Sequence, residues 1–256
     1  SYKHSLQSSI ASNLWITLSI IRFNKNDRYT ASLNLDINFK DDLSLLFDLS
    51  GNKTTKKYYQ QEVSPIDYAY NTNRAIPIKN EDGTLHYYKK PYSIYLYNFN
   101  ILNELNNSGN KQESSSFTMK ANLLYSPLSW LKLNGTFSYT LSNTELESYW
   151  DAKTYHAATL RYGEYGEEFD AEQTTLPGGG ELTQSLTRNE TYTVRLQLDI
   201  NKYLGKNEHH NINASIGVET NSTHYKETTT TNRGYYPDRG MQFAVFNVGD
   251  YPKYYN

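Results

Sequence analysis

The sequence contains no cysteine, which excludes disulfide scaffolds and zinc sites built from thiolates. This absence fits a bacterial envelope protein, although cysteine-free proteins also occur in the cytosol. No run of about 18 apolar residues occurs, so the sequence predicts no transmembrane helix. Lysine and arginine number 25 against 27 acidic residues, and this near balance gives no reason to expect nucleic-acid binding.

The mean hydropathy is low, at −0.76, yet a membrane barrel is compatible with this value. Only alternate residues of a barrel strand meet lipid, and long loops dilute the average. Residues 1–5 carry no charged and apolar leader, so we expect a mature exported chain or an internal fragment. Tyrosine is abundant, with 25 residues among 256, which suits interfacial girdles and ligand-contacting loops.

The clearest pattern lies between Arg28 and Gly51. Every second residue from Tyr29 to Phe39 is apolar, and every residue between them is polar. A polar turn at residues 40–42 follows, and the alternation then resumes. Two-faced strands joined by a tight turn predict a β-hairpin. Their length favours a barrel wall, with the apolar side facing lipid and the polar side facing a wet interior.

The same alternation recurs and predicts one domain, residues 1–256, of all-β class: a transmembrane antiparallel meander β-barrel with long external loops. The expected strands are 3–11, 14–23, 28–39, 43–51, 115–125, 130–142, 188–201 and 209–226. A turn at Ser12 and Asn13 would separate the first two. The long segments 52–112, 143–187 and 227–256 would lie at one end and the short turns at the other, which is the asymmetry of outer-membrane barrels.

Two local predictions concern the first long loop. Asp82 and Gly83 form a strong turn signal. Residues 97–109 favour a short helix that stops at Gly109.

Four stretches carry a family resemblance: RYTASLNLDINFKDDLSLLFDLSGN (28–52), NRAIPIKNEDGTLHYY (73–88), YNFNILNELNNSG (97–109) and RGYYPDRG (233–240). They resemble the SusC/RagA-type TonB-dependent transporters of Bacteroidetes. This resemblance implies a plugged barrel of about 22 strands, of which the chain would be an internal part of the wall. Against that family pattern, we expect this chain to contain no plug domain, no TonB-binding segment and no terminal strand. The resemblance also implies import of oligosaccharides or peptides, a SusD-type surface lipoprotein as lid, and TonB as the source of energy.

The long loops hold the candidate residues for contact with a ligand or with the lid. Aromatic stacking on a sugar or peptide is one reading of them, and packing of large loops against each other is the other. These residues are Tyr68, Tyr70, Arg74, Tyr149, Trp150, Tyr155, Arg161 and Tyr162.

No pattern indicates bond chemistry. The segment 143–187 is acidic, but no spacing fixes a carboxylate pair and no D-x-D-x-D-G loop supports calcium binding. His209 and His210 would point to opposite faces of a strand and could not share a metal. We therefore expect no catalytic residue, no cofactor and no metal, and a protein that is not an enzyme.

Two other readings of the pattern remain. A complete, small barrel of about eight strands would act structurally or as an adhesin, and would pair its first strand with its last. A soluble carbohydrate-binding β-sandwich would cover the apolar stripe with a second sheet.

Overall fold

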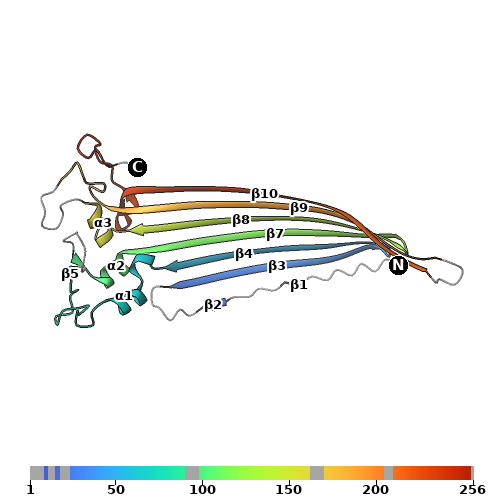
Figure 1. The fold of residues 1–256 in the computed structure, drawn as a ribbon, viewed down its shortest axis with the longest axis horizontal. Helices are drawn as coiled ribbons and strands as arrows, with labels where there is room; N and C mark the ends of the chain where they lie inside the picture. Colours follow the sequence, from blue (N-terminus) through green and yellow to red (C-terminus); the bar gives the residue numbers. More distant parts are fainter. Residues whose placement is uncertain are drawn as a thin grey trace.

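One curved antiparallel sheet makes up most of the chain (Figure 1). The computed structural model describes residues 9–10, 15–17, 24–89, 98–161, 170–204 and 210–254. The fold is an all-β antiparallel meander, as the alternation predicted, and each long strand bonds to the next one in the chain. The long strands are β3 (Lys25–Lys40), β4 (Leu43–Tyr58), β7 (Ser108–Leu128), β8 (Leu131–Trp150), β9 (Gly180–Leu204) and β10 (His210–Tyr236).

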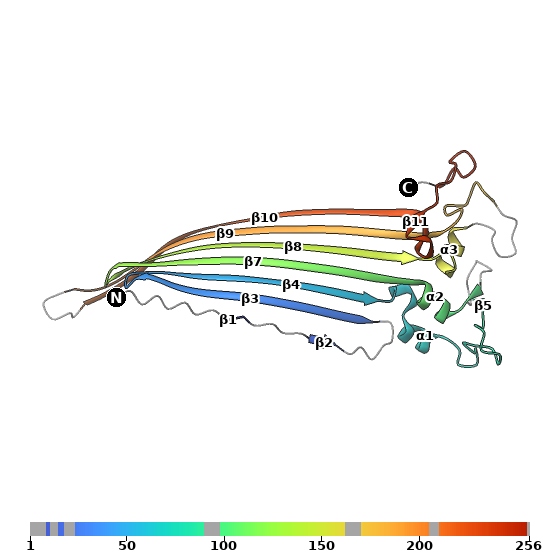
Figure 2. The same ribbon diagram turned by 180° about the vertical axis from the view of Figure 1, so that it is seen from behind.

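Short elements occupy the edges and loops. The short strands are β1 (Ser9–Ile10), β2 (Trp15–Thr17), β5 (Tyr88–Lys89), β6 (Asn98–Phe99) and β11 (Gln242–Phe243). The helical elements are η1 (Gln61–Val63), α1 (Pro65–Asn71), α2 (Ile101–Asn107), α3 (Tyr155–Leu160) and η2 (Pro237–Arg239). Figures 1 and 2 show α1, α2 and α3 gathered at one end of the sheet, which we call the loop end.

The register aligns apolar residues of neighbouring strands into rows. Antiparallel partners point to the same face of a sheet. One row runs through Leu35, Phe47, Ala121, Phe137 and Val194. We call the side that carries this row the apolar face. Its side chains stay accessible, with exposed fractions of 58% at Leu196 and 70% at Ile216.

The opposite side, the polar face, carries Asn34, Asp48, Lys120, Ser138 and Thr193 as partners in one row. Its side chains bond from strand to strand. The Thr136 hydroxyl donates to the amide oxygen of Asn122 at 2.8 Å, and the Ser215 hydroxyl donates to the Asp199 carboxylate at 2.7 Å. The sheet is therefore a wall with one apolar and one hydrogen-bonding side.

Two alternatives to a barrel wall disagree with this sheet. Among the residues that the structure describes, no second sheet lies over the apolar face, as a β-sandwich would require. The outermost long strands, β3 and β10, do not pair with each other within the described ranges. The described sheet is open, which contradicts a small barrel closed by these strands.

All six long strands reach further toward the loop end than the alternation predicted. β4 ends at Tyr58 instead of residue 51, β7 begins at Ser108 instead of 115, and β8 ends at Trp150 instead of 142. The loops between these strands are therefore shorter than the sequence predicted. The added residues are mostly polar on both faces, so hydropathy alternation gives no signal there. The ladder of backbone hydrogen bonds continues nevertheless.

Ser12 and Asn13, where the sequence predicts a turn, lie outside the described residues, but the short strands on either side of them are described. Ser9 pairs with Asn34 and Trp15 pairs with Arg28, both antiparallel to β3. Ser9 and Trp15 are six residues apart, and so are their partners Asn34 and Arg28. β1 and β2 therefore keep one register along the same edge of β3. They take one strand position instead of two. The remaining residues of the expected strands 3–11 and 14–23 lie outside the described ranges.

The two local predictions fare differently. Gly83 adopts φ +85° in a turn, and its N–H donates to the Asn80 carbonyl at 3.0 Å, which confirms the turn. Helix α2 is confirmed within 97–109, but Gly109 does not end it. The chain passes from Asn107 directly into β7, because the ladder with β8 already begins at Ser108.

Gly180 marks the position where β9 meets the end of β8. A Cβ added there would lie 1.9 Å from the carbonyl oxygen of Trp150. We expect Gly180→Ala to lower the free energy of unfolding by about 2–3 kcal/mol, because the backbones must separate. Denaturant unfolding followed by circular dichroism measures this loss.

Gly51 of β4 is the matched control. Its added Cβ would lie 3.6 Å from the Ser116 carbonyl oxygen, an ordinary contact. Gly51→Ala should change the unfolding midpoint little. A similar loss at both positions would contradict the close approach at Gly180.

Candidate functional site

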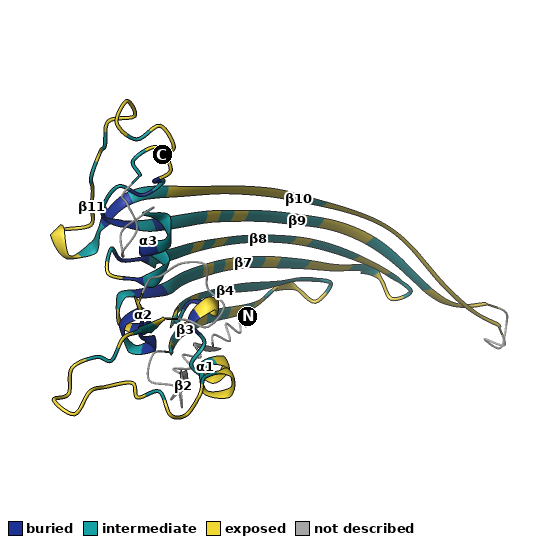
Figure 3. Cartoon of the chain, turned by 60° about the vertical axis from the view of Figure 1, so that its left-hand side comes forward, coloured by how far each residue is buried: buried dark blue, intermediate teal, exposed yellow. Residues whose placement is uncertain are grey.

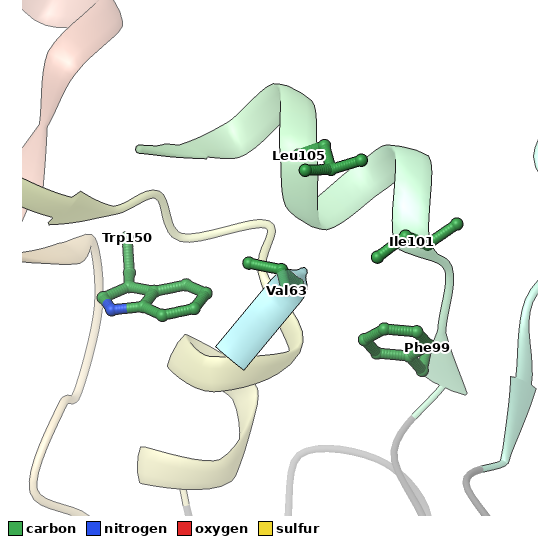
Figure 4. Close-up of a cluster of buried hydrophobic side chains, with 5 residues drawn as sticks. All are labelled: Val63, Phe99, Ile101, Leu105 and Trp150. Atoms are coloured by element: carbon green, nitrogen blue, oxygen red, sulfur yellow. The ribbon is translucent and has the colours of Figure 1, made fainter. Parts of the chain in front are cut away.

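The buried residues of the molecule concentrate at the loop end, as the dark blue segments of Figure 3 show. Five of them form one apolar cluster: Val63, Phe99, Ile101, Leu105 and Trp150 (Figure 4). Each is at most 8% exposed. Trp150 is the last residue of β8 and, by alternation, points to the polar face. The cluster therefore packs on the polar-face side of the sheet end.

Asn100 connects this cluster to the first long loop. Its side-chain oxygen accepts hydrogen bonds from the N–H groups of Leu102 and Asn103 at 2.9 and 3.2 Å, which caps α2. Its amide nitrogen donates to the carbonyls of Ile78 and His86 at 2.8 and 2.7 Å. One buried side chain thus fixes both the start of α2 and the 78–86 turn.

Glu104 connects α2 to α3. It is 1% exposed, and its Oε1 accepts from the N–H of Tyr155 at 2.8 Å and from the amide of Asn103 at 3.0 Å. The same Asn103 amide donates to the Lys153 carbonyl at 2.7 Å. Buried polar groups are stable only with such partners. The two loops therefore form one hydrogen-bonded layer.

His156, Glu181 and Arg233 connect the two later loops. His156 stacks on Trp150 with ring centroids 4.5 Å apart, and its Nε2 lies 3.3 Å from Glu181 Oε1. Arg233 Nε donates to Glu181 Oε2 at 3.1 Å. The hydrogen bond from His156, followed by that from Arg233, lowers the pKa of Glu181 below its usual value. Glu181 thus joins α3, β9 and the end of β10.

The structure brings some of the predicted loop residues together. The rings of Tyr155 and Phe99 meet edge to face, with centroids 5.7 Å apart. The Tyr68 ring centroid lies 6.3 Å from that of Phe99, and Trp150 belongs to the cluster. The rings of Tyr149 and Tyr235 also lie near each other, with centroids 6.5 Å apart. Arg161 donates to the carbonyls of Ala152, at 3.0 Å, and Gly179.

Two of the predicted residues lie outside the cluster, and a third is not described. Tyr70 is 85% exposed and Arg74 is exposed as well, outside the cluster. Tyr162 lies outside the described residues. Contact of the eight residues with a ligand or lid stays a prediction.

Sequence reasoning missed the polar residues that hold the loop end together. Asn100 could have been found, because an Asn before the apolar run ILNEL is a helix-cap signal. Glu104, His156, Glu181 and Arg233 carry no such signal. Their partners are up to 52 residues away in the chain.

Among the described ranges, no three His, Asp or Glu side chains lie close enough to hold a metal ion. In the same part of the chain, no helix is both long enough and apolar enough to cross a membrane. What the arrangement offers is an amphipathic wall with a buried, hydrogen-bonded loop layer at one end.

The class that this architecture defines is the antiparallel meander wall of a β-barrel. A solved structure described as the RagAB peptide transporter is similar to it, with a TM-score of 0.65 and 16% sequence identity. The match covers 89% of this chain and 24% of the transporter chain, so this chain spans about a quarter of that length. No family of known proteins and no curated protein matches the sequence.

Glu181 provides a pH-dependent prediction for the loop end, outside the apolar band. Because the folded state lowers the pKa of this carboxyl group, its contribution to stability is fully present above the ordinary value near 4.5. The contribution is lost as the pH falls through the lowered value. We expect Glu181→Gln to cost about 2 kcal/mol at neutral pH.

Thermal unfolding of both proteins between pH 3 and 8 tests this expectation. The difference between wild type and Glu181→Gln should shrink toward the acid end. Exposed Glu172 is the control, and Glu172→Gln should unfold like the wild type at every pH. A loss of stability in Glu181→Gln, relative to wild type, that is the same at pH 3 and pH 8 would count against the charged network.

Proposed function

We propose that this chain forms part of the wall of an outer-membrane importer of the SusC/RagA type. One observation carries the proposal: an apolar face continuous across the long strands, opposite a polar face. On β8 this band runs from Leu131 to Leu141, about 33 Å along the strand at about 3.3 Å per residue. If the strand is tilted by about 40° from the barrel axis, the band measures about 25 Å along that axis. This is the height of the apolar band of outer-membrane barrels.

The same arrangement accounts for the loop end. Beyond the band the strands continue into polar sequence, and the helical layer closes over the polar-face side. In a barrel this layer would lie at the outer mouth, where the vestibule meets arriving substrate. We propose that a SusD-type surface lipoprotein covers it. TonB would supply the energy from the periplasmic side, through parts of the transporter other than this wall.

Peptides or oligosaccharides are the proposed cargo. The similarity to a structure described as a peptide transporter supports peptides, and the tyrosine-rich loops suit both classes. Import moves the substrate without breaking bonds. The protein is accordingly proposed to be a transporter component with no catalytic residue, cofactor or metal of its own.

The membrane assignment makes a prediction about neighbouring residues of β3. Leu35 lies on the apolar face and Asn34 on the polar face. Leu35→Lys would place a charge in hydrocarbon and should cost about 2–4 kcal/mol near the midplane, whereas Asn34→Lys should cost much less. Folding into lipid bilayers under a denaturant gradient measures both values.

The same two variants in detergent-free buffer provide the control. A protein that dissolves and folds there without amphiphile, with equal losses for both variants, would contradict the wall assignment.

The transport assignment predicts an uptake defect. Cells that lack the protein should lose accumulation of a fluorescent peptide set or a fluorescent oligosaccharide set, and the wild-type gene should restore it. The set that is lost identifies the cargo class. Unchanged uptake of both sets would contradict the importer.

A further inference from the structure

We propose that Arg188 of β9 and Lys226 of β10 form a binding site for the phosphate of a membrane lipid headgroup. The two residues are direct partners in the register of these strands. Their side chains therefore project from the same face of the sheet, with Cβ atoms about 5 Å apart. This inference rests on the membrane assignment proposed above and adds one specific lipid contact to it.

The site lies just beyond the loop-end edge of the apolar band. Leu141 is the last residue of that band on β8, and Asn143, two residues further on, pairs with Arg188. Two residues span about 7 Å along a strand, or about 5 Å along the axis of a barrel whose strands tilt by about 40°. The headgroup layer adjoins the hydrocarbon and is about 5–8 Å thick on each side of a bilayer. Both cations therefore lie at the depth of the lipid headgroups.

The register row through the two residues carries cations and no carboxylate. Like charges directly opposite each other on neighbouring strands destabilise a sheet. An anion bound between Arg188 and Lys226 would remove this repulsion. Across the long strands the row consists of Tyr29, Lys53, Ser115, Asn143, Arg188 and Lys226.

The protein itself supplies only part of the counter-charge. Arg188 pairs with Glu190 of its own strand, and its Nε and Nη2 both reach Glu190 Oε1. A guanidinium has five N–H donors, so donors remain for a second acceptor. Within the described ranges, the Lys226 side chain makes no hydrogen bond or ion pair, and Lys226 is exposed. One phosphate could therefore bind both side chains through charge-assisted hydrogen bonds.

The surroundings favour a lipid over a free anion. Glu227, the carboxylate next to Lys226, points to the polar face, where it accepts from the Ser185 hydroxyl at 3.3 Å. On the side of the cations, Tyr192 lies four residues from Arg188 toward the apolar band and is 47% exposed. A headgroup held by the two cations would thus place its acyl chain along this ring.

Native mass spectrometry of the full-length protein in a nonionic detergent tests the proposal. The probes are dimyristoylphosphatidic acid and dimyristoylglycerol, which differ only in the phosphate, and inorganic phosphate serves as a competitor. The proteins are wild type, Arg188→Gln, Lys226→Gln, Glu190→Gln and the control Lys120→Gln. Lys120 is exposed on the polar face, so this control removes the same charge from the other side of the wall.

We expect phosphatidic acid to bind the wild type and Lys120→Gln equally, and more tightly than dimyristoylglycerol does. Its Kd should rise about fivefold in Arg188→Gln and in Lys226→Gln, because each removes one cation beside an anionic headgroup. In Glu190→Gln the Kd should fall instead, because a negative charge next to the phosphate is lost. A change that merely loosened the strands would not tighten binding.

Equal binding of the two lipids would overturn the phosphate site, and so would a Kd for phosphatidic acid that is unchanged in Lys226→Gln. If Arg188→Gln fails to fold, Lys226→Gln and Glu190→Gln decide. Complete displacement of phosphatidic acid by millimolar inorganic phosphate would indicate a site for free anions and overturn the lipid source. Failure of the wall assignment would appear separately, as a protein that dissolves and folds without amphiphile.

Discussion

The structure depends on one constraint: every strand must keep its apolar residues in register with those of its neighbours. A slip of one residue would turn a whole strand over and place its polar side chains among Leu35, Phe47 and Phe137. Paired backbone groups make the sheet continuous, and the register makes it two-faced. A hydrocarbon environment requires both, because it offers no partner for an unpaired backbone group. The barrel-wall assignment and the continuous polar face both follow from this one alignment.

The loop end obeys a different rule. There the chain leaves the ladder, and its polar groups need partners inside the protein. Asn100, Glu104 and Glu181 supply them, each by joining segments that are distant in sequence. The apolar cluster around Trp150 gives this layer a small core of its own. Most of the burial in the molecule is therefore found where the sheet ends, while the sheet itself stays accessible on both faces.

Sequence alternation located the strands well and their ends badly. Residues 28–39 and 115–125 were found because one face of each is apolar, and the loop-end extensions were missed because both faces there are polar. Of the candidate site, Trp150 and Tyr155 were recognised as important aromatics. Their packing against Phe99 depends on contacts that no local pattern encodes.

The sequence by itself determined the two-faced strands and helix α2, because these depend on neighbours one to four residues apart. Only the tertiary structure decided that β1 and β2 share one edge, that the loops form one layer, and that Glu181 meets His156 and Arg233. These features join residues tens of positions apart, and their energy comes from burial and pairing that exist only once the chain has folded.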